Sequence, residues 1–472
     1  MRGAQRSRIV KATGWVMLGN VAPMIVALAV VPFLLQRLGQ ERLGVLSLVW
    51  VLVGYFSFLD MGLGRAVTVA VAAWRAQHPD ERGQELQILG SAGAALGGLG
   101  LAVALLLGLA ACAWGLPAHF SSPQIEAESL RAVLVMLPGL PLLLLSSILR
   151  GHMEGTGAFR SLNLVRMPTG VLLLAAPCLT ALVTPSLVWA CAAILVVRAG
   201  NVLALAVLVA RDMGLAPAAL ALALAGGGDR AWLGRLLSFG GWVTVSNVVG
   251  PVIVYLDRFV IGTLMTAAAV AFYSVPFDVI ARLPVLVASL CSVLLPELAR
   301  QAFGPAAGGM QASRRLVRKA SLASAAVVAA LVGFGIALAP LALAWWLGAD
   351  FADRSALLAR VLLLAFGINA LAQIPFTALQ AAGCARAVAL LHLAELLPYA
   401  GMLIWAVGAF GLAGAAWAWT LRGLIDYAAL AWLWHRQSSR GNGSSTLAPD
   451  GRCPGAGGAG AGEAGRHSAS RA

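Results

Sequence analysis

Charge is scarce in this chain. Only 11 % of its 472 residues are charged, whereas 60 % are hydrophobic and the mean hydropathy is +0.87. Since a soluble domain carries roughly a quarter charged residues, this composition excludes an ordinary soluble protein and indicates a polytopic membrane protein. The net charge is +14, but the Arg residues are scattered in short segments between apolar runs. They form no continuous basic face, which argues against a nucleic-acid partner.

Motifs for chemistry are also missing. The sequence has no Walker A loop, no HExxH and no GxSxG, so it offers neither ATP hydrolysis nor a recognisable catalytic centre. Its six Cys form no CxxC, and no two of its six His share a metal-binding spacing. We therefore expect no enzyme activity, no cofactor and no metal.

Long apolar runs are abundant, and about twelve of them could cross a bilayer as helices. Helix is the expected state because a lipid-exposed backbone must satisfy its own hydrogen bonds. The first run is too long for a signal peptide and has no cleavage site, so it is expected to remain as a span. The runs fall near 13–35, 44–72, 87–114, 129–149, 163–183, 186–210, 236–256, 266–296, 320–347, 355–381, 387–408 and 411–434.

The two halves of the chain repeat one another. Gly14-Trp15-Val16 returns as Gly241-Trp242-Val243, an offset of 227 (241 − 14). Gly157 with the three residues after it matches the segment from Gly383 at 226 (383 − 157). Arg198 and Arg422 correspond at 224 (422 − 198). The repeat predicts two pseudo-symmetric six-helix bundles and favours a transporter with its path between them.

The repeat and the charge pattern suggest a domain plan. We expect an N-terminal bundle over 1–211, a cytoplasmic linker over 212–235, a C-terminal bundle over 236–436 and a disordered tail over 437–472. The linker contains an apolar stretch too short to span, which could lie in the membrane interface. Arg and Lys concentrate in the loops on one side, so both termini are predicted to be cytoplasmic.

Charges within the spans need an explanation, because each costs on the order of 3 kcal/mol at mid-bilayer. Two pairs have i,i+4 spacing, Asp278 with Arg282 and Arg422 with Asp426. Either each pair neutralises itself and orders its bundle, or the Arg residues line a cavity and attract an anion. Arg65 favours the cavity, since the acid nearest to it on its own helix is five residues away. The other charges placed near the middle are Asp60, Arg198 and Glu395.

Uncharged polar residues also recur within the spans. Hydrogen bonds between helices explain them more simply than ligand contacts, although a polar cavity stays open as a second interpretation. They include Asn20, Asn201, Asn247, Asn369 and Gln373.

Four segments together resemble the polysaccharide-flippase (Wzx-like) branch of the multidrug/oligosaccharidyl-lipid/polysaccharide exporter superfamily. The resemblance covers almost the whole chain except the tail, and the order of the segments makes it specific. The segments are Phe58 to Arg65 (FLDMGLGR), Asp257 to Gly262 (DRFVIG) with Ala271 to Pro276 (AFYSVP) and Leu295 to Leu298 (LPEL), Leu391 to Glu395 (LHLAE) with Tyr399, and Gly411 to Trp419 (GLAGAAWAW) with Arg422 and Asp426.

The resemblance implies a MATE-like fold, two six-helix bundles around a central cavity in the bacterial inner membrane. It implies that an undecaprenyl-diphosphate-linked oligosaccharide is moved between leaflets by alternating access. Besides this substrate and membrane lipids, a polysaccharide polymerase and glycosyltransferases are possible partners. The expected cations for the diphosphate are Arg65, Arg282 and Arg422, with Asp60, Asp278, Glu395 and Asp426 for ion coupling or charge balance.

Two alternatives stay open. A multidrug or cation antiporter on the same fold would favour an acidic or aromatic cavity, which the roughly balanced mid-membrane charges disfavour only modestly. A membrane-integral polysaccharide polymerase or ligase would be expected to carry a large outer loop, and the outer loops here are short. The sequence indicates neither the glycan, nor the coupling ion, nor the oligomeric state.

Overall fold

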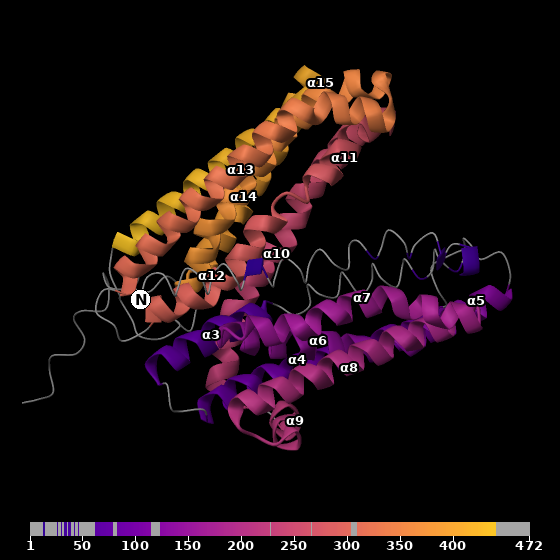
Figure 1. The fold of residues 1–472 in the computed structure, drawn as a ribbon, viewed down its shortest axis with the longest axis vertical. Coiled ribbons are helices and arrows are strands. Elements are labelled where there is room, and N and C mark those ends of the chain that lie inside the picture. Colours follow the sequence, from indigo (N-terminus) through magenta and orange to yellow (C-terminus); the bar gives the residue numbers. More distant parts are fainter. Residues whose placement is uncertain are drawn as a thin grey trace, which may run out of the picture. The chain divides into compact units, whose positions relative to one another are not determined.

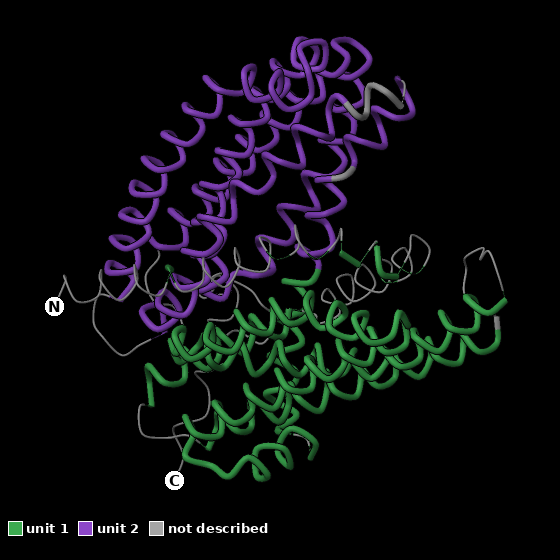
Figure 2. Tube along the Cα trace, turned by 45° about the vertical axis from the view of Figure 1, so that its right-hand side comes forward, with its two compact units in different colours: residues 1–244 green, residues 245–472 purple. Residues whose placement is uncertain are grey.

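The computed structural model describes most of the chain as helices in two compact units. The described residues are 62–78, 83–114, 123–226, 228–265, 267–303 and 309–439, with scattered positions between 13 and 46. The units are Met1–Thr244 and Val245–Ala472 (Figure 2). Each unit has its own core, so each is described by itself.

The described part of unit 1 contains seven helices and the first part of an eighth (Figure 1). Helix α6 packs against α3, α4 and α8, which makes it the central helix of the described part of this unit. The helices are α3 (Leu63–Gln77), α4 (Gly83–Trp114), α5 (Pro123–Met136), α6 (Gly139–Gly155), α7 (Phe159–Val183), α8 (Leu187–Met213), the short α9 (Pro217–Gly226) and the beginning of α10 (Arg230–Leu264).

Unit 2 is built around α14, which packs against α11, α12, α13 and α15. Its long helix α15 is interrupted at Gly411, whose φ of 59° lies in the left-handed region that glycine adopts without strain. The helices are the rest of α10, α11 (Ala267–Ile280), α12 (Val285–Phe303), α13 (Gly309–Leu347), α14 (Ala349–Ala381) and α15 (Ala385–Ser439).

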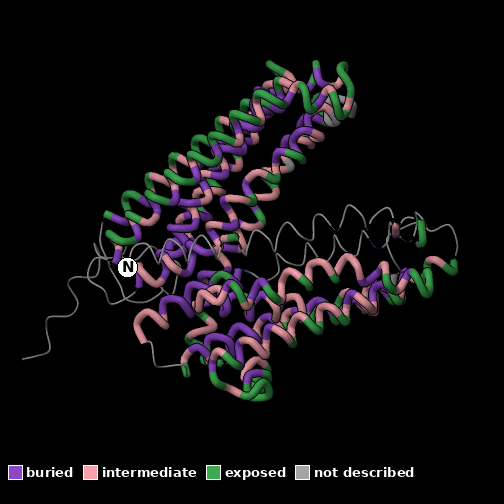
Figure 3. The backbone as a smooth tube through the Cα atoms, viewed as in Figure 1, coloured by how far each residue is buried: buried purple, intermediate pink, exposed green. Residues whose placement is uncertain are grey.

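The described residues include nine helices that are long and apolar enough to cross a membrane. They follow the apolar runs of the sequence, and α9 corresponds to the short apolar stretch expected in the linker. In the most apolar 18-residue stretch of α14, 61 % of the residues are buried inside the protein, whereas only 11 % are buried in the most apolar stretch of α13. Large apolar side chains remain exposed along α4, such as Leu105 and Leu109. Exposed residues, green in Figure 3, recur along the helices of both units. An apolar exterior of this kind is expected for a surface that faces lipid.

The helix bounds repeat the spacing found in the sequence. Gly83 begins α4 and Gly309 begins α13, an offset of 226 (309 − 83). Phe159 and Ala385, which begin α7 and α15, have the same offset (385 − 159). The fifth and sixth helices of the repeat are therefore α7 and α8 in unit 1, and the two parts of α15 in unit 2.

The turn before these helices is the same in both units. Gly157 has a φ of 77° and Gly383 a φ of 81°. The residue after each glycine donates its backbone N–H to a carbonyl five residues earlier, from Ala158 to Met153 at 2.9 Å and from Cys384 to Leu379 at 2.9 Å. Both turns are glycine-terminated helix ends, which explains why the sequence match is clearest here.

Candidate functional site

Three buried charged side chains of unit 2 meet between the two parts of α15. The interruption at Gly411 brings residues that are 27 positions apart (422 − 395) into contact. Arg422 Nε lies 3.6 Å from Glu395 Oε2, and Arg422 Nη2 lies 3.6 Å from Asp426 Oδ2. His392 Nε2 lies 3.6 Å from the other oxygen of Asp426. The sequence predicted the pair of Arg422 and Asp426, and the structure adds Glu395 and His392.

The Arg422 guanidinium is also held by aromatic rings. Its Cζ atom lies 5.4 Å from the ring centroid of Trp419 and 6.0 Å from that of Tyr399. The three residues are 8 %, 1 % and 2 % exposed. Two carboxylates and two aromatic faces surround this cation, so it is neutralised within the protein.

The expected pair of Asp278 and Arg282 does not form. Helix α11 ends at Ile280, so the i,i+4 geometry is lost before Arg282 is reached. Asp278 instead accepts a hydrogen bond from Arg258 Nη2 of α10 at 2.5 Å. Proline at position 284 has no backbone N–H to continue α11, which explains why the helix stops where the sequence alone suggested continuity.

Arg282 lies in the turn between α11 and α12 and is exposed. The turn is held by short-range hydrogen bonds, from Arg282 N to Val279 O at 3.2 Å and from Leu283 N to Ile280 O at 2.9 Å. Among the described residues, no acid pairs with the guanidinium of Arg282. An interrupted helix at membrane depth is tolerated where it is buried in protein or lines a water-filled space.

The other residues expected from the sequence are spread over both units. Arg65 is exposed in the first turn of α3. Asn247 on α10 is half-buried, as are Asn369 and Gln373 on α14, and no hydrogen bond from these three side chains is found in the described ranges. Asn20 and Asp60 lie outside the residues that the structure describes.

A buried carboxylate on α10 is not evident from the sequence. Asp257 is fully buried, and its Oδ2 accepts a hydrogen bond from the Tyr273 hydroxyl of α11 at 2.6 Å. Tyr273 is fully buried as well. Both residues belong to segments that carry the family resemblance, but nothing in their spacing of 16 residues indicates contact.

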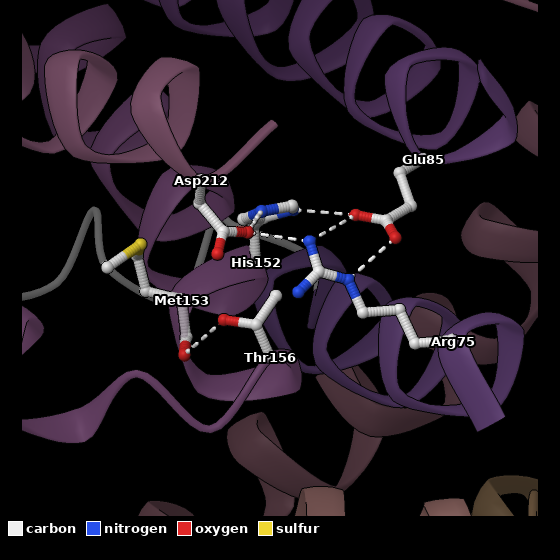
Figure 4. Close-up of polar contacts among 6 residues, drawn as sticks. All are labelled: Arg75, Glu85, His152, Met153, Thr156 and Asp212. Atoms are coloured by element: carbon white, nitrogen blue, oxygen red, sulfur yellow. Dashed lines mark hydrogen bonds and ion pairs between the residues drawn. The ribbon is translucent and has the colours of Figure 1, made fainter. Parts of the chain in front are cut away.

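An ionic cluster in unit 1 was not predicted either, because no spacing in the sequence indicates that its residues meet. Arg75 donates to both oxygens of Glu85, at 2.7 and 3.0 Å, and to Asp212 at 2.6 Å (Figure 4). The buried His152 places Nε2 3.2 Å from the same oxygen of Asp212. The four side chains come from α3, α4, α6 and α8, so the cluster fastens the ends of four helices together.

No group of three or more His, Cys, Asp or Glu that could hold a metal ion occurs among the residues described. The polar side chains named above include ion pairs, hydrogen bonds to carboxylates, half-buried amides and exposed arginines. This arrangement suits binding and charge balance at membrane depth.

Comparisons with known proteins identify the relatives of this chain. A family described as "Polysaccharide biosynthesis protein" matches residues 9–301. A putative O-antigen transporter of Shigella flexneri is 29 % identical over 432 residues, which cover 91 % of this chain and 99 % of that protein.

Solved structures of MATE transporters share the fold. A multidrug resistance transporter of the MATE family in an outward-facing conformation matches with a TM-score of 0.75 at 16 % identity, covering 92 % of this chain and 96 % of that one. A MATE transporter of Vibrio cholerae matches with a TM-score of 0.73 at 17 % identity, covering 93 % and 98 %. The expected MATE-like, all-helical membrane fold is confirmed.

Proposed function

Since this chain belongs to the polysaccharide biosynthesis protein family, we propose that it carries an undecaprenyl-diphosphate-linked oligosaccharide across the inner membrane by alternating access. The observation that carries the proposal is the similarity to a putative O-antigen transporter, which extends over 99 % of that protein. A match of this extent favours a transporter of the same class over an enzyme that shares only a few segments.

The chemistry of the substrate defines what the protein must supply. A lipid diphosphate with an attached glycan is an anionic, strongly hydrated head on a long apolar tail. Crossing unaided would place the charges and the sugar hydroxyls in hydrocarbon, at a cost of several kcal/mol for each unsatisfied polar group. A polar path with a few cations lowers this barrier while the tail stays in lipid.

Arg65 and Arg282 are the cations that we assign to the diphosphate. Both are exposed although they belong to apolar stretches, and Arg282 lies at a break between two helices. An arginine fork matches the geometry of phosphate oxygens. Uncharged residues that would add hydrogen bonds for the glycan are Asn20, Asn247, Asn369 and Gln373.

Arg422 receives a different role within this proposal. Because it is buried and lies beside Glu395 and Asp426, we assign the three residues to charge balance inside unit 2. Asp278 balances Arg258 in the same way. The role of Asp60 remains a prediction from the sequence.

Alternating access would move the two units against one another around the bound head group. The proposal includes both termini on the cytoplasmic side, as the distribution of Arg and Lys predicts. Reporter fusions test this orientation: position 79 should be cytoplasmic and position 121 periplasmic. The reverse pattern would exclude it. Glycosyltransferases would act before this protein, and a polymerase would act after it.

The test of function is export of surface polysaccharide in cells whose only copy carries Arg65→Ala or Arg282→Ala. We expect export to be lost while the protein is inserted at normal levels. Arg354→Ala is the matched control, since Arg354 is exposed in α14 and pairs with Asp350 at 3.3 Å. Normal export in both variants would reject the cation assignment.

Loss of the whole protein should accumulate lipid-linked oligosaccharide on the cytoplasmic leaflet. If polysaccharide export is instead unaffected and cells become sensitive to cationic drugs, the multidrug antiporter of the same fold would replace the proposal. Release of a polymerised or transferred glycan by the purified protein would favour a polymerase or ligase.

A further inference from the structure

We propose that Arg198, in the middle of α8, binds the diphosphate of the substrate at mid-membrane depth. This inference rests on the function proposed above. It adds a residue from unit 1 that the sequence singled out as a buried charge but that the cation assignment did not include.

The depth of Arg198 follows from its place in α8. It is the twelfth of the 27 residues of Leu187–Met213, so its Cα lies about 16 Å from the first residue and about 22 Å from the last. The hydrocarbon core is about 30 Å thick, so a helix of about 40 Å centred in the bilayer places Arg198 about 11 Å inside the nearer boundary. Lipid headgroups are therefore distant partners for this side chain.

No acid among the described residues pairs with Arg198. The side chain is half-buried and its Nε has no hydrogen-bond partner. Within the described residues, no ion pair to the guanidinium is found. A mid-membrane cation is costly and is expected to meet a partner or a wet space.

Arg422 is the counterpart of Arg198 in unit 2. There, the fifth and sixth helices of the repeat supply acids to the arginine. Glu395 comes from the fifth helix and Asp426 follows Arg422 by four residues. In unit 1 the fifth helix, α7, contains no Asp or Glu, and the position four residues after Arg198 is Val202. The same helix pair therefore balances its arginine in one unit and leaves it unbalanced in the other.

The surroundings of Arg198 are built to hold the side chain in place. Helix α6 begins at Gly139, and a Cβ atom there would lie 3.5 Å from Arg198 Cδ, so the aliphatic stem packs against backbone. Asn201 follows three residues later, and its Oδ1 accepts a hydrogen bond from Thr169 of α7 at 3.2 Å. The Thr169 hydroxyl also lies 2.8 Å from Val165 O, so its single proton is shared between the two acceptors. The Asn201 NH₂ group is a second donor near the same helix face.

A diphosphate fits these donors better than other anions available at this depth. It brings charged oxygens that accept from both guanidinium and amide groups, and it must pass the middle of the membrane during translocation. A phospholipid headgroup carries a similar phosphate but stays at the interface. The two sources are distinguished by the experiment below.

The experiment measures binding of undecaprenyl diphosphate and of phosphatidylglycerol to the purified full-length chain by native mass spectrometry. We expect Arg198→Gln to weaken binding of undecaprenyl diphosphate about 10-fold or more, since a hydrogen bond to a charged group is lost, and Arg198→Lys to weaken it less. Arg211→Gln, at the exposed end of the same helix, is the charge-matched control and should bind like the wild type.

A second variant supplies the missing acid instead of removing the cation. Val202→Asp places a carboxylate four residues after Arg198, as Asp426 stands to Arg422. We expect it to weaken binding of the diphosphate while Val202→Asn does not. This variant keeps the test valid if Arg198→Gln should fail to fold.

Each result bears on a separate claim. If the wild type binds undecaprenyl diphosphate and Arg198→Gln and Val202→Asp bind it equally well, the role of Arg198 is rejected and the proposed function stands. If Arg198→Gln weakens phosphatidylglycerol as much as undecaprenyl diphosphate, Arg198 is a lipid anchor and the inference is wrong. If the wild type binds no polyprenyl diphosphate and no lipid-linked oligosaccharide, the proposed function itself fails.

Discussion

Replacement of Arg422 tests whether the cluster of Arg422, Glu395 and Asp426 is held together by charge. The formal charges of the three are +1, −1 and −1. Coulomb's law with an effective dielectric constant of about 20 gives about 4.6 kcal/mol for one pair at the observed 3.6 Å. Desolvation offsets much of this attraction in the intact cluster. It does not do so once Arg422 is gone, because the two buried carboxylates then lose the cation that they share, and only the His392 imidazole remains near Asp426.

We therefore expect Arg422→Leu to lower the free energy of unfolding by about 3 to 5 kcal/mol. Glu395→Gln alone should cost about 1 kcal/mol or less, because Asp426 still pairs with Arg422. In the double variant, however, Glu395→Gln removes one of the two uncompensated charges. The double variant should therefore be more stable than Arg422→Leu by at least about 1 kcal/mol, so the effect of Glu395→Gln changes sign with its background.

Denaturant unfolding in mild detergent, followed by tryptophan fluorescence, measures these differences. The double-mutant cycle isolates the coupling between Arg422 and Glu395. Two results would refute the reasoning: an Arg422→Leu variant as stable as the wild type, or a double variant whose loss equals the sum of the single losses. Either would mean that the cluster is solvated, and that Arg422 is again a candidate for the substrate.

Two further predictions concern unit 1. Arg75→Met should destabilise the protein by about 3 to 5 kcal/mol, because it leaves Glu85, which is 1 % exposed, without its arginine. Asp212→Asn should destabilise it less, because Asp212 is more exposed, and equal stability of Arg75→Met and wild type would contradict the prediction. Gly151→Ala should lower the free energy of unfolding by about 1 to 3 kcal/mol, since a Cβ there would lie 2.4 Å from the Gly64 carbonyl oxygen. Gly98→Ala, with nothing within 4 Å of the added Cβ, should be neutral or stabilising. Thermal unfolding compares the two variants, and an unchanged stability of Gly151→Ala would show that α3 and α6 can separate.

Local spacing predicted some of the charged contacts correctly. Arg422 and Asp426 are four residues apart on one uninterrupted helix, so their contact follows from helix geometry alone. Asp278 and Arg282 have the same spacing, but α11 ends between them and Asp278 pairs with Arg258. The difference is the helix end at Ile280, which depends on where proline 284 interrupts the backbone hydrogen bonds.

Contacts between helices could not be predicted in this way. Arg75, Glu85, His152 and Asp212 are separated by up to 137 residues, and no motif joins them. Asp257 and Tyr273 stand on adjacent helices, but the face that each presents depends on how α10 and α11 pack. The sequence of an apolar run does not indicate which side chain of a neighbouring helix a buried polar side chain will contact.

The sequence by itself determined the helical state, the approximate positions of most described spans and the internal repeat. Lipid leaves a backbone only its own carbonyls as partners, so hydropathy and length are sufficient to locate helices. Tertiary structure decided which arginines gain partners beyond their own helix, because Arg422 meets Glu395, and Arg258 meets Asp278, only where helices pack together. Arg198 and Arg422 are equivalent in the repeat, yet only the packing of each unit shows that one has two acids beside it and the other has none among the residues described.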